Sequence, residues 1–260
     1  MKNYIQEIWR TRYFWLALVH MDIRARYRGS ALGLGWSLLN PIAMTGIFCV
    51  VFATLFQQNI ATFAPYALTG LTLWNFVSQT MAMGCNTFHQ AEAYIRQHPV
   101  PMAIYPLRLV LANAFHLVIA LVLAIILSTW GTGFAGVLPL LSLIPSLCLI
   151  VVMGWSIACL LGLMNVYFRD IKHLTDVGLQ VLMYLTPIWY PEKLLREKGL
   201  AWLVNGNPLV PFLHLVRAPL LDHQMPSLET YGAALLVASA FFLMAAWSLK
   251  AREPKLIYFL

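Results

Sequence analysis

Three arginines, Arg24, Arg26 and Arg28, occupy alternate positions directly before a run of apolar residues that continues almost unbroken to Phe56. A guanidinium group stays charged at physiological pH and resists entry into hydrocarbon. Positive charge beside a long apolar segment is typical of the cytoplasmic end of a membrane span, where it fixes the direction of crossing. The net charge of +7 therefore needs no nucleic acid partner to explain it.

The carboxylates that could act as acids, bases or metal ligands are scattered along the chain. They are Glu92, Asp170, Asp176, Glu192, Glu197, Asp222 and Glu229. A membrane transferase or hydrolase needs such groups to converge on one pocket. The sequence also lacks the Gly-x-x-x-x-Gly-Lys-Ser/Thr phosphate loop. We therefore predict that the chain is not an enzyme, holds no metal or cofactor of its own, and depends on another chain for any nucleotide hydrolysis.

The composition indicates a membrane protein. Of 260 residues, 60% are hydrophobic and 10% are charged, whereas soluble domains have roughly half apolar and a quarter charged residues. A helix needs about 20 apolar residues to cross a bilayer. The apolar runs predict a single all-α membrane domain over 1–260, with spans at 34–56, 64–86, 104–130, 137–164 and 230–249 and a shorter one at 177–190. No Asp, Glu or Lys lies inside these spans, so coupling to an ion gradient is not expected.

Basic residues are divided unequally between the two ends of the predicted spans. Six of the 17 Lys and Arg residues precede the first span, two lie at 87–108, two at 165–176 and three at the C-terminus, and the remaining four lie between 191 and 229. Because basic residues are enriched on the cytoplasmic side of membrane proteins, both termini are predicted to be cytoplasmic. Two termini on one side require an even number of crossings, so the short segment at 177–190 is expected to cross as well.

Three segments outside the spans have patterns of their own. Residues 1–30 repeat apolar groups at helical spacing, which predicts an amphipathic helix in the plane of the membrane surface. Residues 87–98 predict a short polar helix that ends at Pro99 and Pro101. Residues 191–229 combine several prolines with apolar pieces too short to cross, which favours short re-entrant or interfacial helices packed on protein.

Four motifs follow one another along the chain: RYRGSALGLGWSLLNP at 26–41, NVYFRDI at 165–171, LTPIWYP at 185–191 and NPLVPFLHLVR at 207–217. In order and spacing they resemble the membrane subunit of ABC-2-type polysaccharide exporters. This family carries O-antigen, capsular polysaccharide or teichoic acid across the bacterial inner membrane. The most specific part of the resemblance is Tyr167, Phe168, Arg169 and Asp170, directly after the fourth span.

The resemblance implies a homodimer of six-span subunits that binds two copies of a separate ATPase, which would hold ATP and Mg²⁺. Its substrate would be a lipid-linked polysaccharide, with O-antigen as the first expectation. Residues 1–30 would form the interface helix, 87–98 the coupling helix and 191–229 the periplasmic gate. The implied hinge between the interface helix and the first span is Arg24, Arg26, Tyr27 and Arg28, and the implied ATPase contacts are Glu92, Tyr94 and Arg96.

Aromatic residues are the expected lining of the channel in such an exporter. Their flat apolar faces can stack on the CH-rich faces of sugars without holding the polymer in one place. The candidates are Trp36, Phe48, Phe52, Trp74, Tyr184, Trp189 and Tyr190, together with Asn40. Pro187 removes a backbone donor and crowds the carbonyl of Met183, so we expect it to be the hinge of the gate.

Other interpretations remain open from the sequence. The arginines could serve only as a topological anchor, and the aromatic residues could be core packing or an interfacial belt. The chain could belong to an exporter of a drug or a small lipid. It could also be a membrane scaffold, or an enzyme with a lipid-linked substrate.

Overall fold

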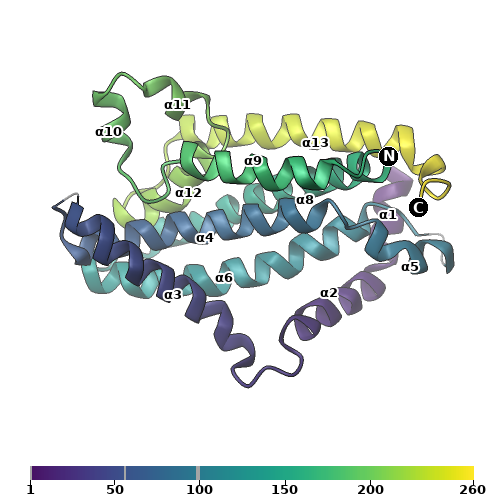
Figure 1. The fold of residues 1–260 in the computed structure, drawn as a ribbon, viewed down its shortest axis with the longest axis horizontal. Coiled ribbons are helices and arrows are strands. Elements are labelled where there is room, and N and C mark those ends of the chain that lie inside the picture. Colours follow the sequence, from purple (N-terminus) through teal and green to yellow (C-terminus); the bar gives the residue numbers. More distant parts are fainter. Residues whose placement is uncertain (1, 56, 98–99) are drawn as a thin grey trace.

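The computed structural model describes residues 2–55, 57–97 and 100–260, and within these ranges all regular secondary structure is helical. Helices α4 (Ile60–Gly84), α6 (Ile104–Thr132), α8 (Leu143–Tyr167), α9 (Ile171–Leu185) and α13 (Leu228–Leu256) lie side by side, and both termini lie at one end of this bundle (Figure 1). The predicted segments at 1–30, 34–56 and 87–98 each include residues outside the described ranges, namely Met1, Phe56 and His98.

Four stretches of the described chain are helical, long and apolar enough to cross a membrane: Gly33–Phe52, Ile104–Thr132, Val137–Tyr167 and Leu228–Leu256. The first joins η1 (Gly33–Gly35), α3 (Trp36–Phe48) and a π-helical segment, η2 (Cys49–Ala53). The third joins α7 (Val137–Leu141) to α8 across Ser142. The prediction of an all-α membrane protein is confirmed at this level.

The other two predicted spans correspond to α4 and α9. Helix α4 has 25 residues and is buried along most of its length. Helix α9 has 15 residues and starts at Ile171, earlier than the apolar run at 177–190 suggested. Its length of about 22 Å is less than the roughly 30 Å of a hydrocarbon core. Helix α9 alone therefore does not span such a core, and residues after Leu185 must cover the remaining distance.

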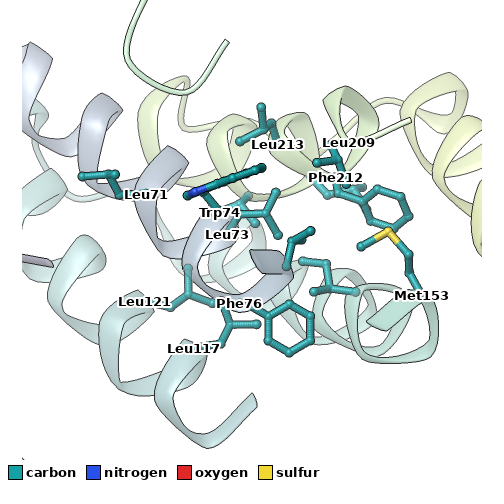
Figure 2. Packing of buried hydrophobic residues seen from close by; sticks show 14 of the residues in the cluster. Leu71, Leu73, Trp74, Phe76, Leu117, Leu121, Met153, Leu209, Phe212 and Leu213 are labelled. Atoms are coloured by element: carbon teal, nitrogen blue, oxygen red, sulfur yellow. The ribbon is translucent and has the colours of Figure 1, made fainter. Parts of the chain in front are cut away.

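Small residues allow α8 to pack closely against α4. Helices in lipid gain little from hydrophobic transfer, so tight contacts and interhelical hydrogen bonds hold them together. A Cβ added to Gly84 would lie 2.9 Å from Cα of Ala158, and one added to Gly162 would lie 2.9 Å from the carbonyl oxygen of Gly84. Earlier in the same helix, Trp74 and Phe76 of α4 pack among apolar residues of α6, α8 and α12 (Val210–Leu221) (Figure 2).

The N-terminal segment consists of two helices where the sequence predicted one. Helix α1 (Lys2–Arg10) ends at Thr11, whose hydroxyl donates hydrogen bonds to the carbonyls of Glu7 at 2.9 Å and Ile8 at 3.1 Å. Helix α2 (Arg12–Tyr27) then packs against α6. Gly29 turns the chain with φ +80° toward α3, and α2 and α3 diverge from the bundle where they meet (Figure 1).

Helix α9 ends where Pro187 requires it to end. The residue before a proline avoids the helical region, and Thr186 has extended backbone angles of φ −95° and ψ 129°. Its hydroxyl donates to the carbonyl of Leu182 at 2.7 Å. We call Thr186–Pro191 the outer turn. It leads to α10 (Glu192–Glu197) and α11 (Ala201–Gly206), which lie at the end of the bundle opposite the termini (Figure 1).

Arg217 of α12 fixes the outer turn in place. Its Nη1 donates to the carbonyl of Pro187 at 2.9 Å and its Nη2 to the carbonyl of Ile188 at 2.8 Å, and the residue is only 5% exposed. The ring of Tyr66 lies 3.8 Å from the guanidinium carbon, and the Tyr66 hydroxyl donates to the carbonyl of Tyr190 at 2.8 Å. Carbonyls outside a helix need such partners when water is excluded.

Two further residues complete the support of the outer turn. Nδ2 of Asn207 donates to the Thr186 hydroxyl oxygen at 2.9 Å and to the carbonyl of Leu185 at 3.3 Å. Gly70 of α4 leaves the space that the turn occupies, because a Cβ there would lie 2.5 Å from the carbonyl oxygen of Ile188. Residues from α4, α12 and the α11–α12 connection therefore determine the path of six residues after α9.

We predict that Arg217→Met lowers the free energy of unfolding by about 3 kcal/mol, because it leaves two buried carbonyls without charged donors. Thermal and denaturant unfolding of the purified protein in detergent measures this. The matched control is Arg196→Met, which removes the same charge from an exposed position of α10. Equal effects of the two substitutions would show that the bonds to the outer turn contribute nothing.

We also predict that Gly70→Ala destabilises the protein by about 1–3 kcal/mol, the usual range for overpacking. The new methyl group would displace Ile188 and Arg217. Gly232→Ala is the control, because a Cβ at Gly232 of α13 meets no atom within 4 Å, and alanine favours a helix by about 1 kcal/mol over glycine. Unfolding midpoints that fall equally for both variants would contradict the close approach.

Candidate functional site

A polar cavity of about 640 Å³ lies where the connection between α2 and α3 faces α4 and α6. We call it the hinge cavity. It contains two predicted hinge residues and two predicted channel residues, Arg26, Tyr27, Trp36 and Asn40. The other predicted hinge residues, Arg24 and Arg28, are exposed and do not line it.

Arg26 crosses from the end of α2 to both α4 and α6. Its Nη1 donates to Oε1 of Gln79 at 3.0 Å, and its Nη2 donates to Oδ1 of Asn113 at 3.0 Å. Nδ2 of Asn113 in turn donates to the Thr80 hydroxyl oxygen at 3.2 Å. The guanidinium is thus held by neutral acceptors at the mouth of the hinge cavity.

Tyr27 and His116 form the second polar group of this cavity. Nδ1 of His116 lies 3.1 Å from the Tyr27 hydroxyl and 3.0 Å from the Ser37 hydroxyl, and these two hydroxyls also contact each other. Nε2 of His116 is shielded from solvent and has no hydrogen-bond partner among the described residues. His116 therefore contacts residues on either side of the α2–α3 hinge.

Five predicted channel residues form an aromatic cluster at the outer turn. Trp189 is its centre, with ring centroids 5.4 Å from Phe48, 6.3 Å from Phe52, 5.9 Å from Tyr184 and 6.3 Å from Tyr190. Trp189 is 7% exposed, whereas Tyr184 is 71% exposed. Of these two residues, only Tyr184 lies at the surface of the chain. Trp74 of α4 packs among residues of α6, α8 and α12 (Figure 2), in the same buried hydrophobic core as Trp189.

A second cavity of about 710 Å³ lies beside the outer turn and is lined by Tyr66, Glu192, His214 and Arg217, among others. Nε2 of His214 and Oε1 of Glu192 are 2.7 Å apart and connect α12 to α10. Burial opposes ionisation of Glu192, but the hydrogen bond and charge of His214, with Arg217 and Arg196, outweigh it, so the pKa of Glu192 lies below its ordinary value.

The opposite end of the bundle carries the predicted coupling segment. It folds as η3 (His89–Ala91) and α5 (Glu92–Gln97). Glu92 and Arg96 pair at 2.9 Å, and their side chains are 40% and 54% exposed. Tyr94 turns instead toward the protein, with its ring 6.2 Å from that of Phe14 and 6.0 Å from the Arg108 guanidinium. Glu92 and Arg96 are therefore open to a partner, while Tyr94 attaches α5 to α2 and α6.

Arg108 links this end of α6 to α2. Its Nε lies 3.6 Å from Oδ2 of Asp22. Burial raises the pKa of Asp22, and the charges of Arg108 and Arg26 partly offset this effect. Helix α6 starts beside two further contacts: Glu253 accepts from the backbone N–H of Met102 at 2.9 Å, and the Tyr4 hydroxyl accepts from that of Ala103 at 3.3 Å. Helices α1, α2, α5, α6 and α13 meet here.

The motif Tyr167–Asp170, at the end of α8, lies at the same end of the bundle. Tyr167 lies under the guanidinium of Arg252 at 4.9 Å and beside the ring of Phe259 at 4.7 Å. Phe168, Arg169 and Asp170 are exposed, with Asp170 at the N-cap position of α9. Asn165 fixes the turn, because its Oδ1 accepts from the N–H of Lys172 at 3.2 Å.

Sequence reasoning did not identify the residues that support the outer turn: Tyr66, Gly70, Asn207 and Arg217. Asn207 and Arg217 belong to the NPLVPFLHLVR motif, so their signal was present, although Arg217 was counted among the loop charges. Gln79 and Asn113 of the hinge cavity were also not singled out. Polar side chains inside apolar runs are the feature that could have found them.

Comparisons with known proteins agree with the motifs. A family profile described as ABC-2 type transporter matches residues 13–221. The chain is 26% identical over 254 residues to the O-antigen export system permease protein RfbA of Myxococcus xanthus, covering 96% of this chain and 95% of that protein. It is 24% identical over 203 residues to a protein of the same name from Klebsiella pneumoniae, covering 76% of each.

A more distant relative is the polysialic acid transport protein KpsM of Escherichia coli, 21% identical over 234 residues that cover 88% of this chain and 87% of that protein. The matched profile extends from α2 to the end of α12 and includes the hinge cavity, α5 and the outer turn. The resemblance stated from the motifs is confirmed, and the chain belongs to the ABC-2 type transporter family.

Proposed function

We propose that this chain is the channel-forming membrane subunit of an ATP-driven exporter of lipid-linked polysaccharide, with O-antigen as the first candidate. The observation that carries the proposal is similarity along nearly the whole chain, 96% of its length, to a protein named as an O-antigen export permease. The substrate would leave the cytoplasm through a channel formed by two copies of this chain in the bacterial inner membrane.

The proposed topology has six crossings, formed by α3 with η1 and η2, α4, α6, α7 with α8, α9, and α13. Both termini lie at the same end of the bundle, which agrees with an even number of crossings (Figure 1). The excess of Lys and Arg in the segments near that end supports a cytoplasmic position for it. The outer turn, α10, α11 and α12 would then form the periplasmic gate.

The exposed face of α9 supports its place at a dimer axis. It presents Leu174, Val177, Val181 and Tyr184, and also the amide of Gln180. Lipid supplies no partner for an amide, whereas a water-filled channel does. The face ends at Tyr184 beside the aromatic cluster, so two copies of α9 would place both clusters at the channel exit.

A separate ATPase, bound in two copies, would hold ATP and Mg²⁺ and would dock on α5. The exposed Glu92 and Arg96 are available for this contact. Helix α5 is joined to α2 through Tyr94 and Phe14 and precedes α6 directly in the chain, so a displacement of α5 would reach both helices.

Deletion of the gene tests the proposed function. We expect surface polysaccharide to disappear and lipid-linked polymer to accumulate on the cytoplasmic side, with recovery when the gene is restored. Electrophoresis of surface polysaccharide and protection of the polymer in inverted vesicles measure the two effects. Normal surface polysaccharide in the deletion strain would reject the function.

For docking, we predict that Glu92→Lys and Arg96→Glu each reduce export and co-purification of the ATPase at least about tenfold, since charge reversal at an interface costs several kcal/mol. Lys193→Glu on α10, at the other end of the bundle, is the control. If both coupling variants assemble and export normally, the ATPase docks elsewhere.

For the channel, we predict that Tyr184→Ala changes the export rate or opens an ion leak while the free energy of unfolding stays within about 0.5 kcal/mol of wild type, the range expected for a surface position. Trp189→Ala should instead destabilise the fold by about 3–5 kcal/mol, because Trp189 is buried. Trp130→Ala, at an exposed aromatic of α6, is the control for a lipid-facing belt. Wild-type export and no leak in Tyr184→Ala would place Tyr184 outside the channel.

A further inference from the structure

The hinge cavity lies near one edge of the hydrocarbon layer. Asn113, in its lining, precedes Thr132 at the end of α6 by 19 residues, which is about 28 Å along a helix. A hydrocarbon core is about 30 Å thick. If the end of α6 at Thr132 marks one face of this core, the cavity extends from Asn113, near the other face, to Ala120, closer to the middle of the core. Its rim at Asn113 is then at the level where head groups of lipids end and their chains begin.

The mouth of the cavity combines polar and apolar surfaces. Leu32, Leu34, Trp36 and Leu39 are exposed around the α2–α3 connection, and Trp36 and Leu39 also line the cavity. Arg26, Asn75, Gln79 and His116 line the same cavity. An apolar border in front of polar groups suits an amphiphile whose tail stays in lipid and whose head group enters the cavity.

The charge of Arg26 acts on Asp22, but no acid among the described residues forms an ion pair with Arg26. Its two hydrogen-bonded side-chain oxygens belong to the amides Gln79 and Asn113. Asp22, one turn earlier on α2, pairs with Arg108 instead, and in the described part of the chain Arg26 forms no ion pair. Arg26 is exposed and lines the cavity, so its guanidinium is accessible to an anion that accepts two hydrogen bonds, and phosphate esters have this geometry.

Neutral hydrogen-bonding groups lie beside the arginine. Nε2 of His116 has no partner among the described residues although it is shielded from solvent. The amides of Asn40 and Asn75 line the same cavity, and each can donate and accept. Such groups match the hydroxyls of a sugar, and a cavity of about 640 Å³ is within the usual range for a small-molecule site.

We propose that the hinge cavity binds the phosphate-bearing head group of a lipid-linked glycan, with the phosphate on Arg26 and the first sugar among His116, Asn40 and Asn75. This inference rests on the proposed function and adds to it the place where the lipid end of the substrate is recognised. The lipid tail would leave the cavity past Trp36 and Leu39.

Binding to the full-length protein in nanodiscs tests the proposal with three probes. They are a polyprenyl diphosphate carrying a disaccharide, the same polyprenyl diphosphate without sugar, and phosphatidylglycerol as a bilayer phospholipid. We expect the glycosylated probe to bind most tightly and phosphatidylglycerol to compete poorly. Equal competition by phosphatidylglycerol would overturn the proposal, because the cavity would then be a general lipid site.

Variants locate the two parts of the head group. Arg26→Gln should weaken both diphosphate probes about tenfold, whereas Arg26→Lys keeps the charge but not the paired donors and should recover only part of the affinity. His116→Phe should weaken only the glycosylated probe, by about threefold or more. Arg12→Gln removes one charge from the same helix and should bind like wild type. Size-exclusion profiles identify variants that fail to fold.

The outcomes separate this proposal from the proposed function. If Arg26→Gln and His116→Phe bind all probes like wild type, the head group is recognised elsewhere, although a deletion strain could still lack surface polysaccharide. If the deletion strain keeps its polysaccharide while the variants lose probe binding as expected, the cavity binds a phosphoglycolipid but the exporter assignment is wrong.

Discussion

A backbone that bends inside a membrane must find partners for carbonyl groups that a helix would have satisfied, and here Arg217 supplies two of them. Its bonds to Pro187 and Ile188 hold the outer turn where α9 stops short. Trp189 follows directly, and the rings of Phe48 and Phe52 in the first span rest on it. One buried guanidinium therefore connects the end of α9 to α12, α4 and α3.

Arg26 and Arg217 each donate two hydrogen bonds through their terminal nitrogens, but they differ in partners and in burial. Arg217 is 5% exposed, donates to two backbone carbonyls and has its face on Tyr66, so its bonds fix the path of the backbone. Arg26 is held only by neutral side chains at a cavity mouth. One arginine thus fixes the backbone of the outer turn, and the other lies at the cavity where the proposed anion would bind.

Much of the fold could be predicted because apolar runs of sufficient length have few alternatives in a membrane. The bounds were less certain. Helix α9 begins before its apolar run because Lys172 and Asp176 pair one turn apart and satisfy each other, which a hydropathy pattern does not register. The break at Thr11 has no signal in the pattern, because the spacing of apolar residues continues across it.

The candidate site was less predictable because it depends on neighbours distant in sequence. Arg217 looked like a loop charge, and its burial requires Tyr66 and Gly70, which lie some 150 residues earlier. Trp74 and Tyr184 are both aromatic residues of predicted spans, yet one packs in the core and the other is exposed. Helical periodicity alone could not tell which neighbour each side chain would meet. Residue type and motif located the regions, and the packing of α4 against α12 determined the roles within them.

Helix α6 joins the two ends of the molecule mechanically. Its 29 residues form a rod about 43 Å long. One end adjoins α5, Arg108 and Asp22, and at the other the Ser128 hydroxyl donates to the carbonyl of Leu220 in α12. A rod of this length that tilts by about 5° about one end carries its other end through about 4 Å. That distance is comparable to the width of an aromatic ring. A small tilt of α6 that starts beside α5 would therefore move its far end enough to change the packing of side chains near the outer turn.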